Sequence, residues 1–239
     1  MKIISKIALM LALLTICSVA LCACGGGAKS AVEKAATIQA KEKVSLDDYI
    51  EAMTNGYLAS EMKNLAKLAS KIEDNEDIYK DFEDDWAKDY EDLVDYYGKG
   101  IKASVKYDDE VDLRNKVLDN YQDTYRGYGE TLKGYVKAYN KLDKNDIEDI
   151  ADDLGLKKSD LESIIKYISS MAEDLRKCDV TDGYDFDITC TVKGADDDRE
   201  NEATARTIKI NGKWISPDAF RTIYNKVLGY LSALTKELK

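Results

Sequence analysis

The residues best suited to chemistry in this sequence are its carboxylates, because the chain contains no histidine. Ser-His-Asp and Cys-His catalysis, His-ligated zinc and the usual acid–base group near neutral pH are therefore excluded. The sequence also contains no P-loop pattern and no glycine-rich dinucleotide-binding fingerprint in a strand–helix context. The carboxylates gather in four short runs, at residues 83–85, 108–110, 152–153 and 196–198.

Such runs could bind calcium or supply the carboxylate pair of a glycosidase. A calcium loop needs oxygen ligands at alternating positions and a glycine at its sharp turn. The nearest match, residues 143–149, has no glycine at that offset, and residues 196–202 could bind an ion only weakly. A glycosidase needs two carboxyl groups about 5–9 Å apart in one cleft, which the spacing along a chain does not determine. We therefore interpret the runs as solvated surface and expect no metal and no cofactor.

Tyrosine is the second candidate, since ten of the 16 tyrosines fall between Tyr79 and Tyr139. They could form an aromatic platform for a glycan or a peptide, because rings stack while hydroxyls form hydrogen bonds. The alternative is the core of a helix bundle whose hydroxyls reach water, and the regular spacing favours it. The candidate ligand-binding residues are Tyr121, Tyr125, Tyr128, Tyr135, Tyr139 and Trp86, with a groove expected near Tyr128 and Tyr135.

Helices must position these side chains. Residues 118–142 carry leucine and tyrosine at alternating spacings of three and four, which is a heptad seam. Small and apolar residues flank the seam, so we expect the inner helix of an intramolecular bundle rather than an exposed coiled coil. Gly127, Gly129 and Gly134 predict a bend in this helix or a close approach to a neighbour. Other helices are expected over 45–72, 78–97, 147–154, 159–177 and 217–238.

The C-terminal part changes to the period of a β-strand. Residues 184–193 alternate between apolar and polar side chains, as in a half-buried strand. Residues 204–210 predict a second strand, and Asn211-Gly212 predicts a two-residue hairpin turn into a third. A polar loop is expected over 194–202. Residues 101–107 fit a further short strand or a frayed connector.

The predicted fold class is α+β and mostly helical. Long helices form the front half, and a small antiparallel sheet of about three strands lies near the C-terminus between the helices that start at Ser159 and Pro217. We expect a signal peptide over 1–23, a lipid anchor and tether leading into the first helix over 24–44, a helical region over 45–145 and an α+β region over 146–239. The last two regions are expected to pack as one compact unit, and two subdomains meeting near residue 145 are the alternative.

The first 23 residues have the layout of a secretory signal peptide. Lys2 and Lys6 precede an apolar stretch over 7–21, which is short for a membrane span of about 20 residues. Leu21-Cys22-Ala23-Cys24 then resembles a bacterial lipobox, with an aliphatic residue three positions before a cysteine and a small residue directly before it. The resemblance implies that Cys24 is acylated after cleavage and holds the domain on the extracytoplasmic face of the cell membrane. Ordinary secretion with cleavage near Ala23 is the alternative.

Charge and cysteine content limit the partners of the mature chain. Removing residues 1–23 takes away two lysines and no acids, which leaves 33 basic and 46 acidic residues and a formal charge of −13. Nucleic acid and anionic headgroups are therefore disfavoured, and the lipid is the expected membrane attachment. Cys178 and Cys190 could form a disulfide outside the cell, although Cys190 also fits a buried thiol on a predicted strand. We expect a monomer.

Residues 182–216, with their strand–loop–strand and Asn-Gly-Lys-Trp sequence, are similar to the tails of small extracytoplasmic lipoproteins from Gram-positive bacteria, some with a cystatin-like or NTF2-like sheet. This chain departs from that pattern by continuing into a long C-terminal helix. The resemblance transfers no functional residue.

Three functions fit these features. The first is a non-enzymatic binding or envelope-interaction module on a lipid anchor, with a cell-wall, peptide or protein ligand, because the lipobox comes with no recognisable catalytic group. The second is a carboxylate-based hydrolase of cell-wall glycan. The third, a solute-binding component of a transporter, is disfavoured because strands and helices do not alternate along the chain.

Overall fold

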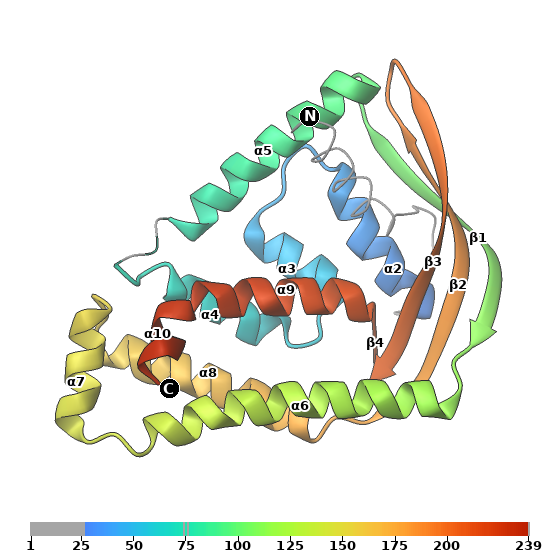
Figure 1. Ribbon diagram of the computed structural model, residues 1–239. Helices are drawn as coiled ribbons and strands as arrows, with labels where there is room; N and C mark the ends of the chain where they lie inside the picture. The colour runs from blue at the N-terminus through green and yellow to red at the C-terminus, as the bar shows by residue number, and fades with distance from the viewer. Residues whose placement is uncertain (1–26, 74, 76, 239) are drawn as a thin grey trace.

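Figure 1 shows the computed structural model, which describes residues 27–73, 75 and 77–238. The first half contains α2 (Ala28–Thr37), η1 (Ile38–Ala40), α3 (Leu46–Thr54), α4 (Ala59–Ala69), α5 (Ile78–Tyr97) and β1 (Lys102–Asp112). The second half contains α6 (Asn115–Tyr139), α7 (Lys144–Asp153), α8 (Lys158–Arg176), β2 (Val180–Lys193), β3 (Asp198–Ile210), β4 (Lys213–Ile215), α9 (Pro217–Tyr230) and α10 (Ser232–Glu237). The predicted α+β class, mostly helical, is confirmed. Within the described part of the chain, no helix is both long and apolar enough to cross a bilayer.

The sheet has four antiparallel strands in the order β1-β2-β3-β4, one more than the three expected. The additional strand is β1, which is longer than the short strand or connector expected over 101–107. A bulge between Tyr107 and Asp109 shifts its register, after which Asp109 pairs with Asp187 and Asp112 with Tyr184. Acidic residues have low strand propensity, so only the pairing with β2 makes this second half extended.

The prediction of a polar loop over 194–202 is wrong for residues 198–202. Asp198 pairs with Lys193 and Glu202 with Thr189, so these residues extend β3 and leave a short turn over 194–197. Every residue over 198–202 is exposed, and such a strand shows no apolar alternation in sequence. The turn packs against the end of α5. A Cβ on Gly194 would lie 1.9 Å from the Tyr97 carbonyl oxygen, so no other residue fits there.

The described residues cover the outer face of the sheet only at one end, where Ile208 and Ile215 are buried against the helices. Phe186, Ile188 and Cys190 are buried on the inner face, while Asp187 on the outer face is exposed. The inner face is covered mainly by α2, which packs against β1, β3 and β4. Residues 28–37 thus form a packed helix within the stretch that the sequence assigned to an anchor and tether. The predicted placement of the sheet between two later helices is only half right, since α9 touches β3 whereas α8 packs against α4 and α6.

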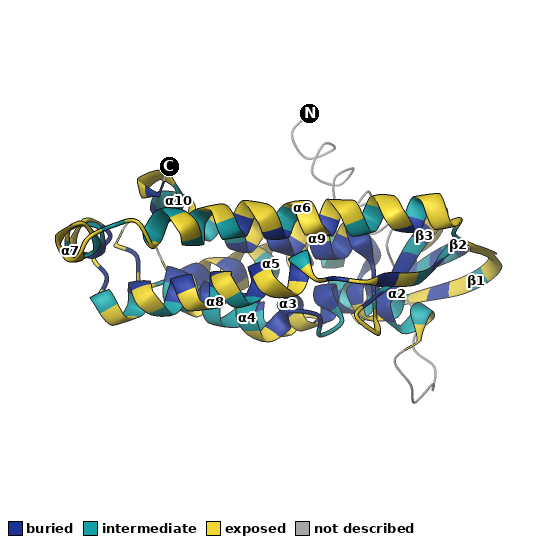
Figure 2. Ribbon diagram, turned by 90° about the horizontal axis from the view of Figure 1, so that it is seen from below, coloured by how far each residue is buried: buried dark blue, intermediate teal, exposed yellow. Residues whose placement is uncertain are grey.

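The buried side chains form two clusters. The larger one joins α3, α4, α6, α8 and α9, and the smaller one lies between α2 and the inner face of the sheet. Seen from below, α6 and α8 lie side by side and turn their buried residues inward (Figure 2).

Helices α6 and α8 approach each other closely at Gly129. A Cβ built there would lie 2.7 Å from the backbone nitrogen of Arg176 and 2.9 Å from the Ala172 carbonyl oxygen. Backbone atoms cannot turn aside as a side chain can, so the pair needs a residue without Cβ at this point. Gly127 and Gly134 on the same helix have no atom within 4 Å of the corresponding position. The sequence predicted either a bend in this helix or a close approach to a neighbour, and the close approach is found at Gly129.

We predict opposite effects for two alanine substitutions in α6. Gly129→Ala forces α6 away from α8 and should lower the free energy of unfolding by about 1–3 kcal/mol. Gly134→Ala meets no atom and should raise that free energy by up to about 1 kcal/mol through helix propensity. Urea unfolding followed by circular dichroism measures both. Equal stability of the two variants would show that the close approach at Gly129 does not constrain the fold.

Candidate functional site

The tyrosines of α6 divide into two stripes. Tyr125 is 2% exposed and lies in the larger cluster with Leu132. Tyr121, Tyr128 and Tyr135 are half-buried at the edge of that cluster. They recur every seven residues, so at 1.5 Å per residue they follow one another at steps of roughly 10 Å along one side of the helix. We call these three residues the tyrosine row.

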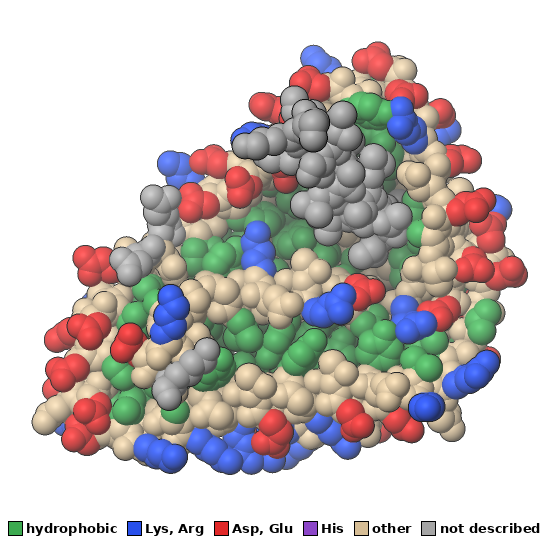
Figure 3. All heavy atoms as spheres, viewed as in Figure 1, with side chains coloured by type: hydrophobic (Ala, Val, Ile, Leu, Met, Phe, Trp, Pro, Cys, Tyr) green, Lys and Arg blue, Asp and Glu red, His purple; other side chains and the backbone are tan. Residues whose placement is uncertain are grey.

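Helix α9 faces the tyrosine row with its own aromatic side chains. The ring of Tyr128 stacks on that of Tyr224, with centroids 4.7 Å apart and planes at 18°. Tyr125 meets Phe220 edge-on at 5.3 Å between centroids. Figure 3 shows hydrophobic side chains gathered between α9 and α6 along this face of the molecule. We call the tyrosine row together with Tyr224 the aromatic band.

One end of the aromatic band meets the sheet. Arg206 donates two hydrogen bonds to the carboxylate of Asp185, its cross-strand partner, at 2.6 Å each. The same guanidinium donates to the Tyr121 hydroxyl at 3.3 Å and lies 5.9 Å from its ring centroid. The hydrogen bonds that Arg206 donates to Asp185 raise the pKa of Arg206 above its usual value. The Arg206–Asp185 pair thus fixes the Tyr121 ring in place.

The structure does not bring all six candidate ligand-binding residues together. Tyr121, Tyr125, Tyr128 and Tyr135 lie on the side of α6 that meets α9. Tyr139 follows Leu132 by seven residues and so belongs to the stripe of Tyr125, outside the tyrosine row. Burial raises the pKa of Tyr139, and the charge of Glu162 on α8 adds to the rise. Trp86 belongs to a separate aromatic group on α5.

The aromatic group of Trp86, Phe82 and Tyr49 lies beside the segment that precedes α3. The indole Nε1 donates to the Lys41 carbonyl oxygen at 2.9 Å, and the ring lies 5.7 Å from both Tyr49 and Phe82. Trp86 lines a pocket of about 490 Å³ with residues of the 42–48 segment. Sequence reasoning missed Phe220 and Tyr224 as partners of α6. The sequence predicted their helix over 217–238, but not its contact with α6.

The two cysteines are buried thiols in different clusters, so the disulfide considered from the sequence is not present. Cys178 lies under α6, where its Sγ is 3.9 Å from the Gln122 carbonyl oxygen. Burial raises its pKa, which lowers its reactivity. Cys190 lies on the inner face of β2 in the smaller cluster.

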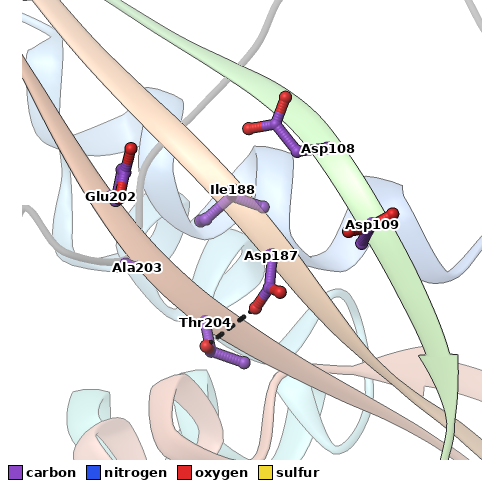
Figure 4. A pocket seen from close by; sticks show the side chains of 7 residues that line it. All are labelled: Asp108, Asp109, Asp187, Ile188, Glu202, Ala203 and Thr204. Carbon is purple, nitrogen blue, oxygen red and sulfur yellow. Dashed lines mark hydrogen bonds between the residues drawn. The ribbon is translucent and has the colours of Figure 1, made fainter.

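The acidic runs lie on exposed surface. Asp108 and Asp109 line a depression of about 590 Å³ on the outer face of the sheet, together with Asp187 and Glu202. Figure 4 shows these carboxylates spread over three strands, with Asp187 accepting a hydrogen bond from Thr204 at 3.1 Å. Among the residues that the structure describes, no group of three or more acidic or cysteine side chains is arranged to bind a metal.

Two other carboxylates share a pocket. Glu61 at the start of α4 and Asp174 near the end of α8 line a space of about 320 Å³ with Lys213. Burial raises the pKa of Asp174, and the charges of Glu61 and Glu173 raise it further. Lys213 donates to the Gly56 carbonyl oxygen at 2.8 Å. Neither Glu61 nor Asp174 belongs to a run singled out from the sequence.

Comparison with known proteins identifies no relative, since no family model, curated protein or solved structure matches this chain. Cys24 and the lipobox lie outside the described residues. The candidate site therefore depends on the geometry of the aromatic band.

The buried phenol of Tyr125 predicts a dependence of stability on alkaline pH. Burial raises the pKa of Tyr125 well above its usual value of 10, and the neighbouring Tyr128 and Tyr121 add to the rise. The unfolded chain therefore loses this proton first, so stability is complete below about pH 10 and falls as the pH rises further. Above about pH 10, the free energy of unfolding of Tyr125→Phe should fall by about 1.4 kcal/mol less per pH unit than that of the wild type. Urea unfolding at about pH 9 and pH 11 measures this, and equal slopes would contradict it.

Proposed function

We propose that this protein is a lipid-anchored extracytoplasmic lipoprotein that binds an envelope ligand through its aromatic band and catalyses no reaction. The observation that carries the binding role is the tyrosine row, half-exposed at regular steps and facing Tyr224. The anchor rests on the lipobox resemblance of Leu21-Cys22-Ala23-Cys24.

The shape of the aromatic band favours an extended ligand. Tyr121, Tyr128 and Tyr135 span two heptads of α6, about four helical turns and roughly 20 Å from first to last. A small molecule would reach only one of these rings. An extended glycan strand presents sugar faces to rings and hydroxyls to phenol groups at regular intervals. The formal charge of −13 on the mature chain disfavours anionic polymers. The ligand class that fits best is therefore a neutral cell-wall glycan.

A carboxylate hydrolase is the second candidate, because Glu61 and Asp174 line one pocket and the pKa of Asp174 is raised. A general acid needs such a raised pKa. The two functions differ in outcome, since a binding module leaves the glycan intact whereas a hydrolase releases soluble fragments.

We predict that Cys24→Ser releases the folded protein into the culture medium. The acidic mature domain has no electrostatic affinity for an anionic bilayer, so the lipid is its only attachment. Immunoblots of the membrane fraction and the medium measure the distribution. Cys22→Ser is the matched control, because Cys22 would be removed with the signal peptide, and it should stay in the membrane fraction. Membrane retention of the Cys24→Ser protein would reveal a second attachment.

We predict that Tyr135→Ala weakens binding to the glycan about fivefold, because a stacked ring contributes about 1 kcal/mol. Co-sedimentation of the Cys24→Ser protein with insoluble peptidoglycan, stripped of anionic polymers, measures the affinity. Tyr135→Phe keeps the ring and should keep most of the binding. Tyr96→Ala is the control for loss of a tyrosine ring outside the aromatic band and should leave binding unchanged. The Tyr96 ring centroid lies 4.5 Å from the Arg199 guanidinium carbon, at the opposite end of the sheet.

Two results would overturn this assignment. Unchanged affinity of Tyr135→Ala would remove the aromatic band from the binding site. Release of soluble fragments by the wild-type protein, lost in Glu61→Gln, would replace the binding module with the hydrolase.

A further inference from the structure

Strand β1 is an open edge of the sheet. It forms one side of the four-stranded order and is the outermost strand in Figure 1, while the opposite edge, β4, has only three residues. Among the described residues, no backbone hydrogen bond outside the ladder with β2 involves Lys102–Asp112. Alternate residues of an edge strand direct their N–H and C=O groups away from the sheet, so this edge can accept another strand.

The charges of β1 are divided between its two halves. Lys102 and Lys106 lie in the first half, which has no acidic residue, and residues 108–112 carry four acids and no base. Some of these charges are already paired, Lys106 with Asp108 and Glu110 with Lys29. Within the described chain, Lys102, Asp109 and Asp112 have no ion-pair partner.

The edge also carries an exposed apolar side chain. Val111 is 60% exposed, which makes it the large hydrophobic residue of the described chain that is most open to water. It pairs across β1 and β2 with Asp185 on the outer face of the sheet. A strand added beside β1 would cover part of this side chain.

We propose that two copies of this chain pair through β1, antiparallel about a two-fold axis near the bulge at Tyr107–Asp109. The two sheets then form one continuous eight-stranded sheet. Antiparallel pairing places the basic half of each strand beside the acidic half of the other. Lys102, Lys106 and Asp109 share the outer face, since they pair with Lys193, Thr189 and Asp187 of β2. The monomer expected from the sequence is replaced by this dimer.

A second copy fits this edge better than other partners. A parallel copy would set lysine beside lysine and acid beside acid, which is repulsive. A strand of uniform charge would match only one half of β1. Charges and a bulge ordinarily protect an edge from unwanted pairing, and here only a partner with the same two halves in reverse order neutralises both. An isologous two-fold interface supplies that partner.

The interface is small, because one strand from each copy forms it. Interfaces below about 1,000 Å² are usually weak and transient in solution. Attachment of both copies to one membrane would raise their effective concentration and favour the dimer. The pairing itself does not depend on the aromatic band or on the ligand proposed for it.

Charge reversal tests the proposal. The Cys24→Ser protein, with the rest of its chain intact, is followed by sedimentation velocity at increasing concentration, and the wild-type edge should form dimers. Lys102→Glu with Lys106→Glu makes both halves acidic and should raise the dimer dissociation constant by roughly tenfold or more. Asp108→Lys with Asp109→Lys makes the outer face of both halves basic and should have the same effect. All four substitutions together reverse the two halves on that face, which restores complementarity and should restore the dimer.

Mixing gives the most specific result. The protein with the acidic edge and the protein with the basic edge should each be monomeric alone and form a heterodimer together. Lys137→Glu with Lys166→Glu, on exposed helix positions, is the control for net charge and should leave the dimer unchanged. Circular dichroism confirms that each variant is folded. A wild-type monomer at every concentration, or a failure of the four-substitution variant to dimerise, would overturn the proposal.

Discussion

The close approach of α6 to α8 at Gly129 is the constraint on which the rest of the molecule depends. Since only a residue without Cβ fits there, the rotation of α6 against the bundle keeps Gly129 turned toward α8. That rotation turns Tyr125 and Leu132 into the larger cluster and leaves the tyrosine row at the rim, beside α9. Stacking of Tyr128 on Tyr224 then couples the position of α9 to that of α6. One glycine therefore determines which face of a long aromatic helix is core and which remains available to a ligand.

The sheet is covered in a different way. Helix α2 and the end of α5 bury the inner residues of β2, with Val32 and Ala36 of α2 and Tyr97 of α5 in the same cluster. The exposed part of the outer face carries polar cross-strand pairs such as Asp185 with Arg206. Because Arg206 also donates to Tyr121, this pair helps to join sheet and bundle, together with the buried Ile208 and Ile215. The aromatic band lies on the helices and the open edge of β1 lies on the sheet, so the two features belong to connected parts of the molecule with separate roles.

Local patterns predicted most of the fold, and long-range pairing explains what they missed. The helix expected over 159–177 matches α8, Lys158–Arg176, because its apolar stripe has a clear helical period. The start of β3 and the end of β1 gave no such signal, since their residues are exposed and are held extended only by β2. The heptad spacing likewise identified the tyrosine row. It could not identify Tyr224, which meets Tyr128 only after the chain has folded, nor could it show that Trp86 lies in a different aromatic group.

The early start of α2 limits how far the protein can reach. Three glycines, residues 25–27, separate Cys24 from the first helical residue, Ala28. Even fully extended they span only about 10 Å. The start of α2 is fastened to the sheet by the Tyr107 hydroxyl, which donates to the Lys29 carbonyl oxygen at 3.0 Å. With Cys24 acylated as proposed, the domain would stand close to the bilayer, at a nearly fixed height. Neighbouring copies would then present their β1 edges at the same level, and a wall polymer would have to approach the membrane to be bound.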